Sequence, residues 1–223
     1  MTAAIVLAAG KSERMGPGID KAFLSLGNKP VLAWSLLAFE RCQDIDSIIL
    51  VVRKDQIVGS KGVARLFGIS KLKAIVTGGD RRQDSVRAGL DVCGMDVKYV
   101  VIHDAARPCI DPETVSAAVA AAKKFPAVTL GRRVTDTIKS VSRGTTVDST
   151  VDRSKLWAVQ TPQAFQLSSL KKAYAALGAR TQITDDCQAA ELAGIPVKIV
   201  ENPKPNIKIT VPADLQIAGA MLK

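Results

Sequence analysis

The sequence predicts a doubly wound α/β fold with a mainly parallel sheet and an inserted β-hairpin. Short, continuous apolar runs rich in Val and Ile alternate with longer amphipathic segments through residues 1–131. Continuous apolar strands are typical of parallel sheets that helices cover on both faces, with right-handed crossovers. From about residue 131 to 160 the chain becomes rich in Thr, Val and Ser and alternates with a period of two, which is typical of a β-hairpin.

Each apolar run of the first half is expected to form a strand, and each amphipathic segment after it a helix. The expected strands are residues 3–9, 47–53, 72–78, 99–104 and 127–131, and the expected helices are 31–42, 58–68, 84–93 and 112–125. After the hairpin we expect a helix at about 166–177, the segment 184–194, a strand at 196–201, a β-like segment at 205–210 and a last helix from 212. With no internal repeat or low-complexity linker, residues 1–223 are expected to form a single domain with a dimerisation arm at about 131–155.

Composition places the chain among ordinary globular proteins, because 47% of its residues are hydrophobic and 23% are charged. No apolar stretch approaches the roughly 20 residues of a membrane span, and no basic segment of a signal peptide precedes the first apolar run. The four cysteines are widely spaced and the chain has one histidine, a pattern that favours neither a zinc site nor a disulfide framework. We therefore expect a cytoplasmic protein with no membrane partner.

The net charge of +10 is compatible with nucleic acid, an anionic membrane surface or small phosphorylated ligands. The basic residues are scattered, and only 4% of the chain is aromatic, which argues against nucleic-acid binding by stacking or groove contacts. Polyphosphate ligands are the favoured explanation, and no nucleic-acid partner is expected.

The first strand runs into residues 10–12, the Gly-Lys-Ser that closes a P-loop. A P-loop also needs a glycine where Ile5 stands, and the dinucleotide fingerprint needs glycines where Ser12 and Met15 stand. Both motifs are excluded. The small residues and the basic side chains such as Arg14 still suit a phosphate, although a simple turn with solvated charges has the same pattern.

Polar clusters follow several of the expected strands. Lys11 and Arg14 follow the first strand, residues 78–85 follow the third, and residues 103–108 follow the fourth. Ligands of open α/β sheets bind outside the carboxyl ends of the strands. We therefore expect these clusters to converge on one rim.

Each candidate residue in these clusters has a structural alternative. Asp104 could hold Mg²⁺ together with substrate phosphates, or cap the following turn; His103 is interpreted as structural. Asp80 and Ser85 could contact a base or a sugar, or belong to a helix cap. Lys208 is expected to point away from the core, as a solvated lysine also would.

Taken together, the motifs resemble the 2-C-methyl-D-erythritol 4-phosphate cytidylyltransferase family, CTP-using enzymes of the non-mevalonate isoprenoid pathway. The resemblance spans residues 5–215 and is carried by "LAAGKSERMG", "GGDRRQDSV", "HDAARP", "VDRSKLWAVQTPQAF", "TDDCQAAELAG" and "NIKITVPADL". It implies a Rossmann-like nucleotidyltransferase fold. One departure is that the usual Pro-Lys-Gln is Asp20, Lys21 and Ala22 here, which keeps the lysine but loses the proline and the amide.

The resemblance implies a role for each matched residue. Arg14, Lys21 and Lys208 would be catalytic, and Asp104 would bind Mg²⁺. The residues that would contact CTP are Ala8, Ala9, Gly10, Gly79, Asp80 and Ser85. The residues that would surround the sugar phosphate are Arg107, Thr137, Arg153, Thr161 and Thr184.

The implied reaction is attack of a methylerythritol phosphate oxygen on the α-phosphorus of CTP, with release of pyrophosphate and without a protein nucleophile. A homodimer is expected, with the hairpin arm placing Thr137 and Arg153 in the neighbouring subunit, because an isolated two-stranded ribbon is marginal in water. An arm folded back on its own domain is the alternative.

Other functions remain open at this point. A ribitol 5-phosphate cytidylyltransferase shares the superfamily loop and fold. A non-catalytic nucleotide-binding regulatory domain would not need the cationic residues. A nucleic-acid-binding module is suggested by charge alone and predicts salt-sensitive binding.

Overall fold

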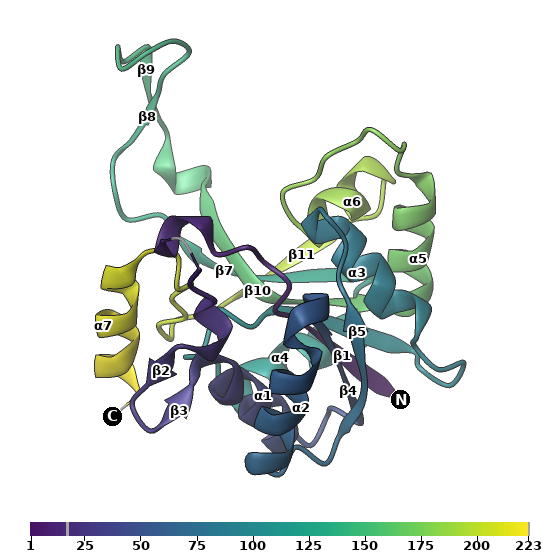
Figure 1. Ribbon diagram of the computed structural model, residues 1–223. Helices are drawn as coiled ribbons and strands as arrows, with labels where there is room; N and C mark the ends of the chain where they lie inside the picture. The colour runs from purple at the N-terminus through teal and green to yellow at the C-terminus, as the bar shows by residue number, and fades with distance from the viewer. Residues whose placement is uncertain (17, 223) are drawn as a thin grey trace.

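The computed structural model describes residues 1–16 and 18–222 of the chain. Within them a seven-stranded sheet has the strand order β11-β7-β10-β6-β1-β4-β5 (Figure 1). Its strands are β1 (Thr2–Leu7), β4 (Ser47–Val52), β5 (Leu72–Thr77), β6 (Tyr99–Asp104), β7 (Ala127–Arg133), β10 (Trp157–Gln166) and β11 (Val197–Glu201). The order places β1 beside β6 and β4, so their carboxyl ends form one continuous rim.

The sheet is mainly parallel, which confirms the predicted α/β fold. β1 pairs in parallel with β4 and β6, β4 with β5, and β7 with β11, whereas β10 runs antiparallel to both β6 and β7. Every residue of β1 and β4 is buried. Burial on both faces is the reason that, after Thr2 and Ser47, these strands are continuously apolar instead of alternating.

Helices cover the two faces of the sheet. They are α1 (Val31–Arg41), α2 (Ile57–Leu66), α3 (Arg82–Asp91), α4 (Pro112–Ala122), α5 (Leu167–Ala176), α6 (Asp186–Leu192) and α7 (Pro212–Met221). One hydrophobic cluster joins α1, α2 and α4 to one face of the sheet, and another joins α3, α5 and α6 to the other face. Successive residues of β1 enter opposite clusters, Ala4 and Val6 the first and Ala3 and Ile5 the second, as the pleat of a strand requires.

Helix starts follow the local sequence. Asp111 precedes α4 and accepts a hydrogen bond from Thr114 N at 2.7 Å, while Pro112 occupies the first turn. Asp185 precedes α6 in the same way and accepts from Gln188 N at 2.8 Å. Both are the N-cap arrangements that satisfy backbone donors at a helix start.

The shorter elements lie at the edges of this frame. They are the 3₁₀ turns η1 (Glu13–Met15), η2 (Lys21–Phe23), η3 (Lys54–Gln56) and η4 (Arg153–Lys155), and the ribbons β2 (Ser25–Leu26) with β3 (Lys29–Pro30) and β8 (Ile138–Ser140) with β9 (Ser149–Val151). A third hydrophobic cluster joins α7 to β2 and to the start of α1. No helix of the described residues is long and apolar enough to cross a membrane.

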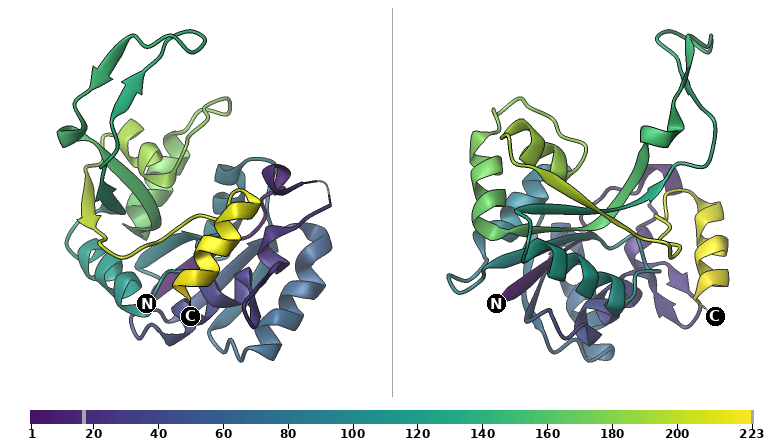
Figure 2. Two further views of the ribbon diagram at one scale, coloured as in Figure 1. Left: turned by 90° about the vertical axis from the view of Figure 1, so that its left-hand side faces the viewer. Right: turned by 180° about the vertical axis from the view of Figure 1, so that it is seen from behind.

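The inserted hairpin is present. β7 and β10 form its base, with Arg133 paired to Trp157, and the β8–β9 ribbon forms its tip. Both views of Figure 2 show this ribbon standing clear of the sheet and its helices. All residues from 140 to 150 are exposed, so the tip makes little contact with its own domain.

The β-like segment expected at 205–210 differs from the structure, which has no strand within these described residues. Ile209 is nevertheless buried, and its backbone N donates to Ala106 O at 2.8 Å. Side chains hold the rest of the segment, since Asn206 Nδ2 donates to Thr161 O at 2.8 Å and Arg107 donates to Asn206 O at 2.7 Å. These contacts do not create the ladder of backbone hydrogen bonds that defines a strand. The contact of Ile209 with Ala106 brings Lys208 to the rim formed by β1 and β6.

Candidate active site

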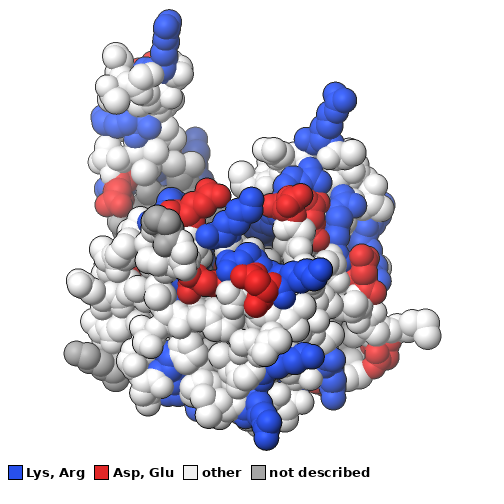
Figure 3. All heavy atoms as spheres, in the orientation of Figure 1, with Lys and Arg blue, Asp and Glu red and all other residues white. Residues whose placement is uncertain are grey.

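A cavity of about 360 Å³ opens at the carboxyl ends of β1, β4, β5 and β6. Its wall comes from the ends of these strands, from η2, from the start of α3 and from Lys208 near the C-terminus. Figure 3 shows a band of Lys and Arg side chains, interspersed with Asp and Glu, across the molecule at this level. Segments distant in sequence thus meet where the strand-end rule predicts a ligand site.

Glycines at the end of β5 allow this loop to pack closely against the end of β1. A Cβ added at Gly78 would lie 2.5 Å from the Ala9 side chain and 2.6 Å from Ser85 Oγ, and one at Gly79 would lie 2.5 Å from the Asp84 side chain. Real side chains do not approach so closely, so only glycine fits. The two loops form a wall of small residues that a nucleotide can approach.

Asp104 is the anionic centre of the cavity. Its Oδ2 lies 2.7 Å from Lys208 Nζ, and its Oδ1 lies 3.2 Å from Arg82 Nε. Burial on its own would raise the pKa of Asp104, but the positive charges of Arg82 and Lys208 outweigh burial and hold this pKa well below its usual value. The carboxyl group is therefore ionised at every pH at which the protein would function.

Lys21 projects from η2 into the same cavity. Its Nζ donates to Ile209 O at 3.0 Å. Burial lowers the pKa of Lys21, and the positive charge of Lys208 lowers it further. A cationic lysine that is partly removed from water and close to a second lysine is suited to attract a polyanion.

Arg82 links this centre to a buried network that sequence reasoning missed. Its Nη1 lies 2.9 Å from Asp186 Oδ2, and the Tyr174 hydroxyl donates to Asp186 Oδ1 at 2.6 Å. Burial opposes the charge on Arg82, but Asp186 and then Asp104 outweigh it and raise the pKa of Arg82. One sequence signal was available, since a positive charge in the first turn of a helix opposes the helix dipole and needs another reason to be there.

The structure brings together most residues that were assigned to the nucleotide and the metal. The cavity lining includes Ala8, Ala9, Gly10, Lys21, Gly79, Asp80, Ser85, Asp104 and Lys208. Arg14, in η1, lies outside this lining. The lining also contains basic residues that have no predicted role in the site: Lys11, Arg53, Lys54, Arg81 and Arg82.

The residues assigned to the sugar phosphate lie outside the cavity lining. Thr161 is buried beside it and accepts from Asp104 N at 3.0 Å, while Arg107 donates to Asn206 O at 2.7 Å. Thr184 is exposed and donates to Gln188 Oε1 at 3.0 Å. The remaining two, in the hairpin arm, are both exposed: Thr137 and Arg153.

His103 fits its structural interpretation. It is fully buried, with Nδ1 3.2 Å from Thr161 Oγ1 and Nε2 3.3 Å from Arg107 O. Burial lowers the pKa of His103 to about 3. The imidazole is therefore neutral and supports the strand end next to Asp104.

This burial predicts a pH dependence of stability. An unfolded histidine has a pKa of about 6.5, so below that pH the unfolded chain takes up a proton that the native His103 excludes. The contribution of His103 to stability is thus fully present above pH about 6.5 and is lost as the pH falls toward about 3.

Because the chain has one histidine, proton NMR resolves its ring signals without assignment, and the native signals should stay at their neutral positions down to about pH 4.5. In urea the same signals should titrate near pH 6.5. Native signals that titrate there as well would show that the imidazole is accessible to water.

Comparisons with known proteins give one and the same family along the chain. The model of one family, 2-C-methyl-D-erythritol 4-phosphate cytidylyltransferase, matches residues 2–223. A protein of that name from Dehalococcoides mccartyi is 42% identical over 220 residues, which cover 99% of this chain and 95% of the relative. Another from Geobacillus kaustophilus is 43% identical over 220 residues, which cover 98% of this chain and 96% of the relative.

Solved structures give the same result. The 4-diphosphocytidyl-2C-methyl-D-erythritol synthase of Anaerococcus prevotii has a TM-score of 0.87 and 31% identity, covering 99% of this chain and 95% of its own. The 2-C-methyl-D-erythritol 4-phosphate cytidylyltransferase of Thermus thermophilus has a TM-score of 0.79 and 30% identity, and the match covers 99% of this chain and 98% of that structure's chain.

Proposed function

Because the chain belongs to the 2-C-methyl-D-erythritol 4-phosphate cytidylyltransferase family, we propose that the cavity above β1 and β6 is its active site. The enzyme transfers CMP from CTP to 2-C-methyl-D-erythritol 4-phosphate and releases pyrophosphate. The observation that supports this site most strongly is the convergence of Lys21, Arg82 and Lys208 around Asp104, beside the wall of small residues.

The chemistry needs positioning more than it needs a reactive side chain. The acceptor phosphate is already anionic, so it attacks the α-phosphorus without a general base, and the departing pyrophosphate carries away negative charge. Lys21 and Lys208 would neutralise the charge that develops on the phosphoryl oxygens, in a cavity that is partly removed from water. Arg14 lies outside the cavity lining, but its positive charge already acts on Lys21, so it would add to the positive potential around the triphosphate.

The nucleotide would lie along the wall of small residues. The backbone of residues 8–10 would hold the phosphates, and Gly79, Asp80 and Ser85 would contact cytosine and ribose. Ser85 Oγ lies at long distances from its backbone acceptors, 3.5 Å from Gly79 O and 3.4 Å from Arg81 O, so it is available to a ribose or base.

Magnesium fits the site only as a substrate-bound ion. Among the described residues no group of three or more acidic, histidine or cysteine side chains could hold a metal alone. Mg²⁺ is commonly bound by one or two carboxylates plus substrate phosphates, and Asp104 is an ionised carboxylate of this kind. Asp104 would hold the ion, which when bound supplies positive charge to the triphosphate. Lys208 and Arg82 keep the carboxylate ionised in its absence.

The acceptor site would be shared between two subunits of a homodimer. Arg107, Thr161 and Thr184 belong to the body of the chain, whereas Thr137 and Arg153 lie in the arm, whose tip stands away from its own domain (Figure 2). The arm exposes Val141 and Val147 to 43% and 52%, apolar surface that a partner would cover. We also place the enzyme in the cytoplasm, in keeping with four cysteines that are free thiols.

The assay that tests the function is pyrophosphate release from CTP with methylerythritol phosphate and with ribitol 5-phosphate, side by side. We expect turnover with the first acceptor only, and a strong preference for CTP over UTP, because acceptors that bind the cytosine amino group would be left unpaired against uracil. Preference for ribitol 5-phosphate would instead assign the chain to the sister activity.

The shared site predicts complementation between inactive subunits. Arg153→Ala and Lys21→Ala are each expected to be inactive as homodimers, because one lacks an acceptor contact and the other a triphosphate contact. In a mixed dimer, purified through two different tags, one site would combine Lys21 of one subunit with Arg153 of its partner. We expect about half of the wild-type activity per dimer.

Two further measurements make this result interpretable. Sedimentation establishes whether the protein is dimeric, and pairing Lys21→Ala with the Lys21→Ala/Arg153→Ala double variant gives a mixed dimer that should stay inactive. A mixed dimer of the single variants that also stays inactive would mean that Arg153 acts within its own chain.

A further inference from the structure

A salt bridge holds the start of the turn that carries Lys21. Asp20 precedes η2, and its Oδ1 accepts a hydrogen bond from Ala22 N at 3.0 Å. Its Oδ2 lies 3.1 Å from Arg53 Nη1, and the Asp20 side chain is only 10% exposed. Within the described part of the chain, the only ion pair of Asp20 is the one with Arg53.

Asp20 is an unexpected residue at this position. Like Asp80 and Asp104, it lines the cavity that we assign to a triphosphate, where a further negative charge would repel the ligand unless a cation neutralises it. It also replaces the proline of the usual family pattern, which fixes its own backbone dihedral. The side chain must therefore have its charge compensated and must be restrained by a contact.

Arg53 is placed to do both. It directly follows β4, and Asp55 accepts from its Nε and Nη2, both at 3.2 Å. On its other side, Nη1 donates to Gly10 O at 3.4 Å as well as pairing with Asp20. The planar guanidinium thus joins the end of β1 to the start of η2, and Asp55 fixes its orientation.

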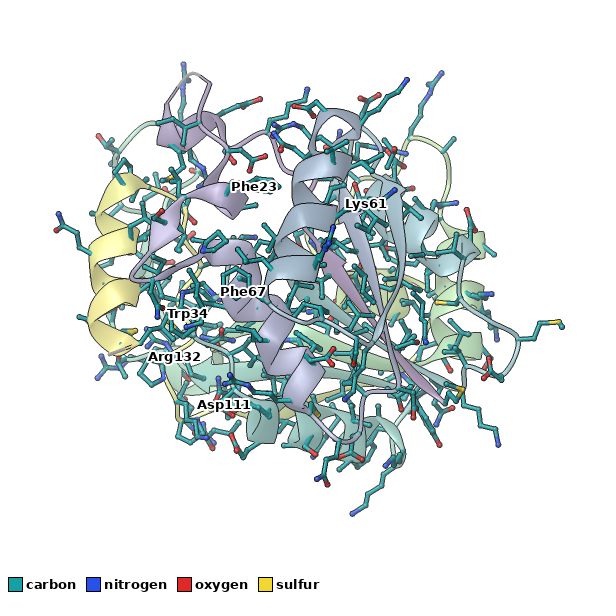
Figure 4. All side chains as sticks on the ribbon, turned by 60° about the horizontal axis from the view of Figure 1, so that its bottom comes forward. Phe23, Trp34, Lys61, Phe67, Asp111 and Arg132 are labelled. Atoms are coloured by element: carbon teal, nitrogen blue, oxygen red, sulfur yellow. The ribbon has the colours of Figure 1, made fainter. Side chains whose placement is uncertain are left out.

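The other end of the turn is held by packing. Phe23 is partly buried against the cluster that includes α1 and α2, and a Cβ added at Gly59 in α2 would lie 3.3 Å from its ring. Figure 4 shows Phe23 beside α2, on the same side of the molecule as Phe67. Lys21 therefore lies between a hydrophobic anchor and an ionic one, and only the ionic anchor can be changed without altering the core.

We propose that the Asp20–Arg53 ion pair is a positioning device that sets the Lys21 turn in its nucleotide-binding geometry before CTP binds. This inference rests on the proposed function, because it assigns the cavity to the triphosphate. Arg53 also lines the cavity, and its proposed role is exerted through its contacts with Asp20 and Gly10. Because the turn is already ordered, CTP binding does not have to supply the free energy of ordering it. Loss of the ion pair should therefore raise KM for CTP and leave kcat nearly unchanged.

The test compares Arg53→Gln, Asp20→Asn and the double variant. Asparagine at position 20 keeps an oxygen that can accept from Ala22 N but loses the ion pair. Each single variant should raise KM for CTP about tenfold and leave kcat within about twofold, and the double variant should be no worse than either single one. Lys61→Gln removes the same charge from an exposed position on α2 and should change neither constant (Figure 4).

The outcomes distinguish a positioning role of Arg53 from direct binding of the triphosphate by Arg53. If Arg53 bound the triphosphate itself, Asp20→Asn would release it and lower KM for CTP while Arg53→Gln raised it, which would overturn the proposal. Effects that multiply in the double variant would also overturn it, because the two residues would then act separately.

A readout without turnover keeps the test independent of the proposed function. Hydrogen–deuterium exchange of the amides of residues 19–24 in the ligand-free protein should be faster in both single variants than in the wild type and in Lys61→Gln. A wild-type protein that releases no pyrophosphate would refute the proposed function and leave this measurement valid. Unchanged exchange in both variants would refute the positioning role.

Discussion

Lys21→Ala is expected to lower kcat by about 100- to 1000-fold while the protein stays folded. Its ammonium group projects into the cavity and donates to Ile209 O at 3.0 Å. Because the side chain is partly buried, its charge is less screened by water and acts more strongly on the phosphoryl oxygens as they become more negative. Loss of one well-placed charge-stabilising donor lowers kcat by about this factor in other enzymes. The effect should fall on kcat more than on KM, because the interaction is stronger in the transition state than in the bound substrate.

Steady-state pyrophosphate release gives both constants, and thermal unfolding shows whether the fold is kept. Lys61→Ala is the matched control, because it removes an exposed lysine on α2, outside the cavity lining. A Lys21→Ala enzyme with near-normal kcat would refute the assignment of η2 to the triphosphate.

Asp104→Asn is expected to abolish the magnesium-dependent reaction, with a loss of at least about 100-fold. The amide preserves the shape of the side chain but lacks the charge that a hard cation requires. The same substitution leaves Arg82 and Lys208 without a shared counter-ion. CTP should therefore bind this variant at least as tightly as wild type when magnesium is absent, although turnover is lost.

Calorimetric titration with CTP in the presence of a chelator, followed by rates across a magnesium series, measures both effects. A variant that keeps its activity and its dependence on magnesium would make Asp104 a structural residue at the end of β6. Weaker metal-free binding of CTP would mean that the carboxylate organises the cationic side chains and does not compete with the ligand for them.

The sequence predicted those parts of the fold that depend on burial along a continuous segment. β1 and β4 are buried on both faces, so after its first residue each is continuously apolar and could be recognised without knowing its neighbours. The predicted hairpin implies that β10 runs antiparallel to β7, but the pairing of β10 with β6 could not be predicted, since an apolar or alternating pattern does not name the neighbouring strand. That pairing depends on how β10 is inserted between β7 and β6.

The same distinction applies to the residues of the site: those at strand ends could be predicted, and those placed by packing between distant segments could not. Residues at strand ends, such as Gly10 and Asp104, could be placed on one rim by the strand-end rule. Arg82 could not, because its role depends on Asp186, which meets it only through the packing of α6 against the sheet. The approach of Lys208 likewise depends on the contact of Ile209 with Ala106, since no strand periodicity in residues 205–210 leads it there.

The central claim, that this cavity binds the nucleotide, is tested most directly by filling it from the backbone. Gly10 lines the cavity, has no positive φ, and a Cβ added there meets no heavy atom of the described residues within 4 Å. A Cβ at this exposed position therefore meets open space, and we expect a leucine side chain to occupy part of the cavity while the fold is kept. Gly62, exposed on α2, meets the same conditions away from the cavity, so Gly62→Leu is the matched control. Calorimetric titration with CTP should give wild-type affinity for Gly62→Leu and a loss of at least about 100-fold for Gly10→Leu, with both variants unfolding at or above the wild-type temperature. Wild-type CTP affinity in a folded Gly10→Leu protein would contradict the claim and place the nucleotide elsewhere.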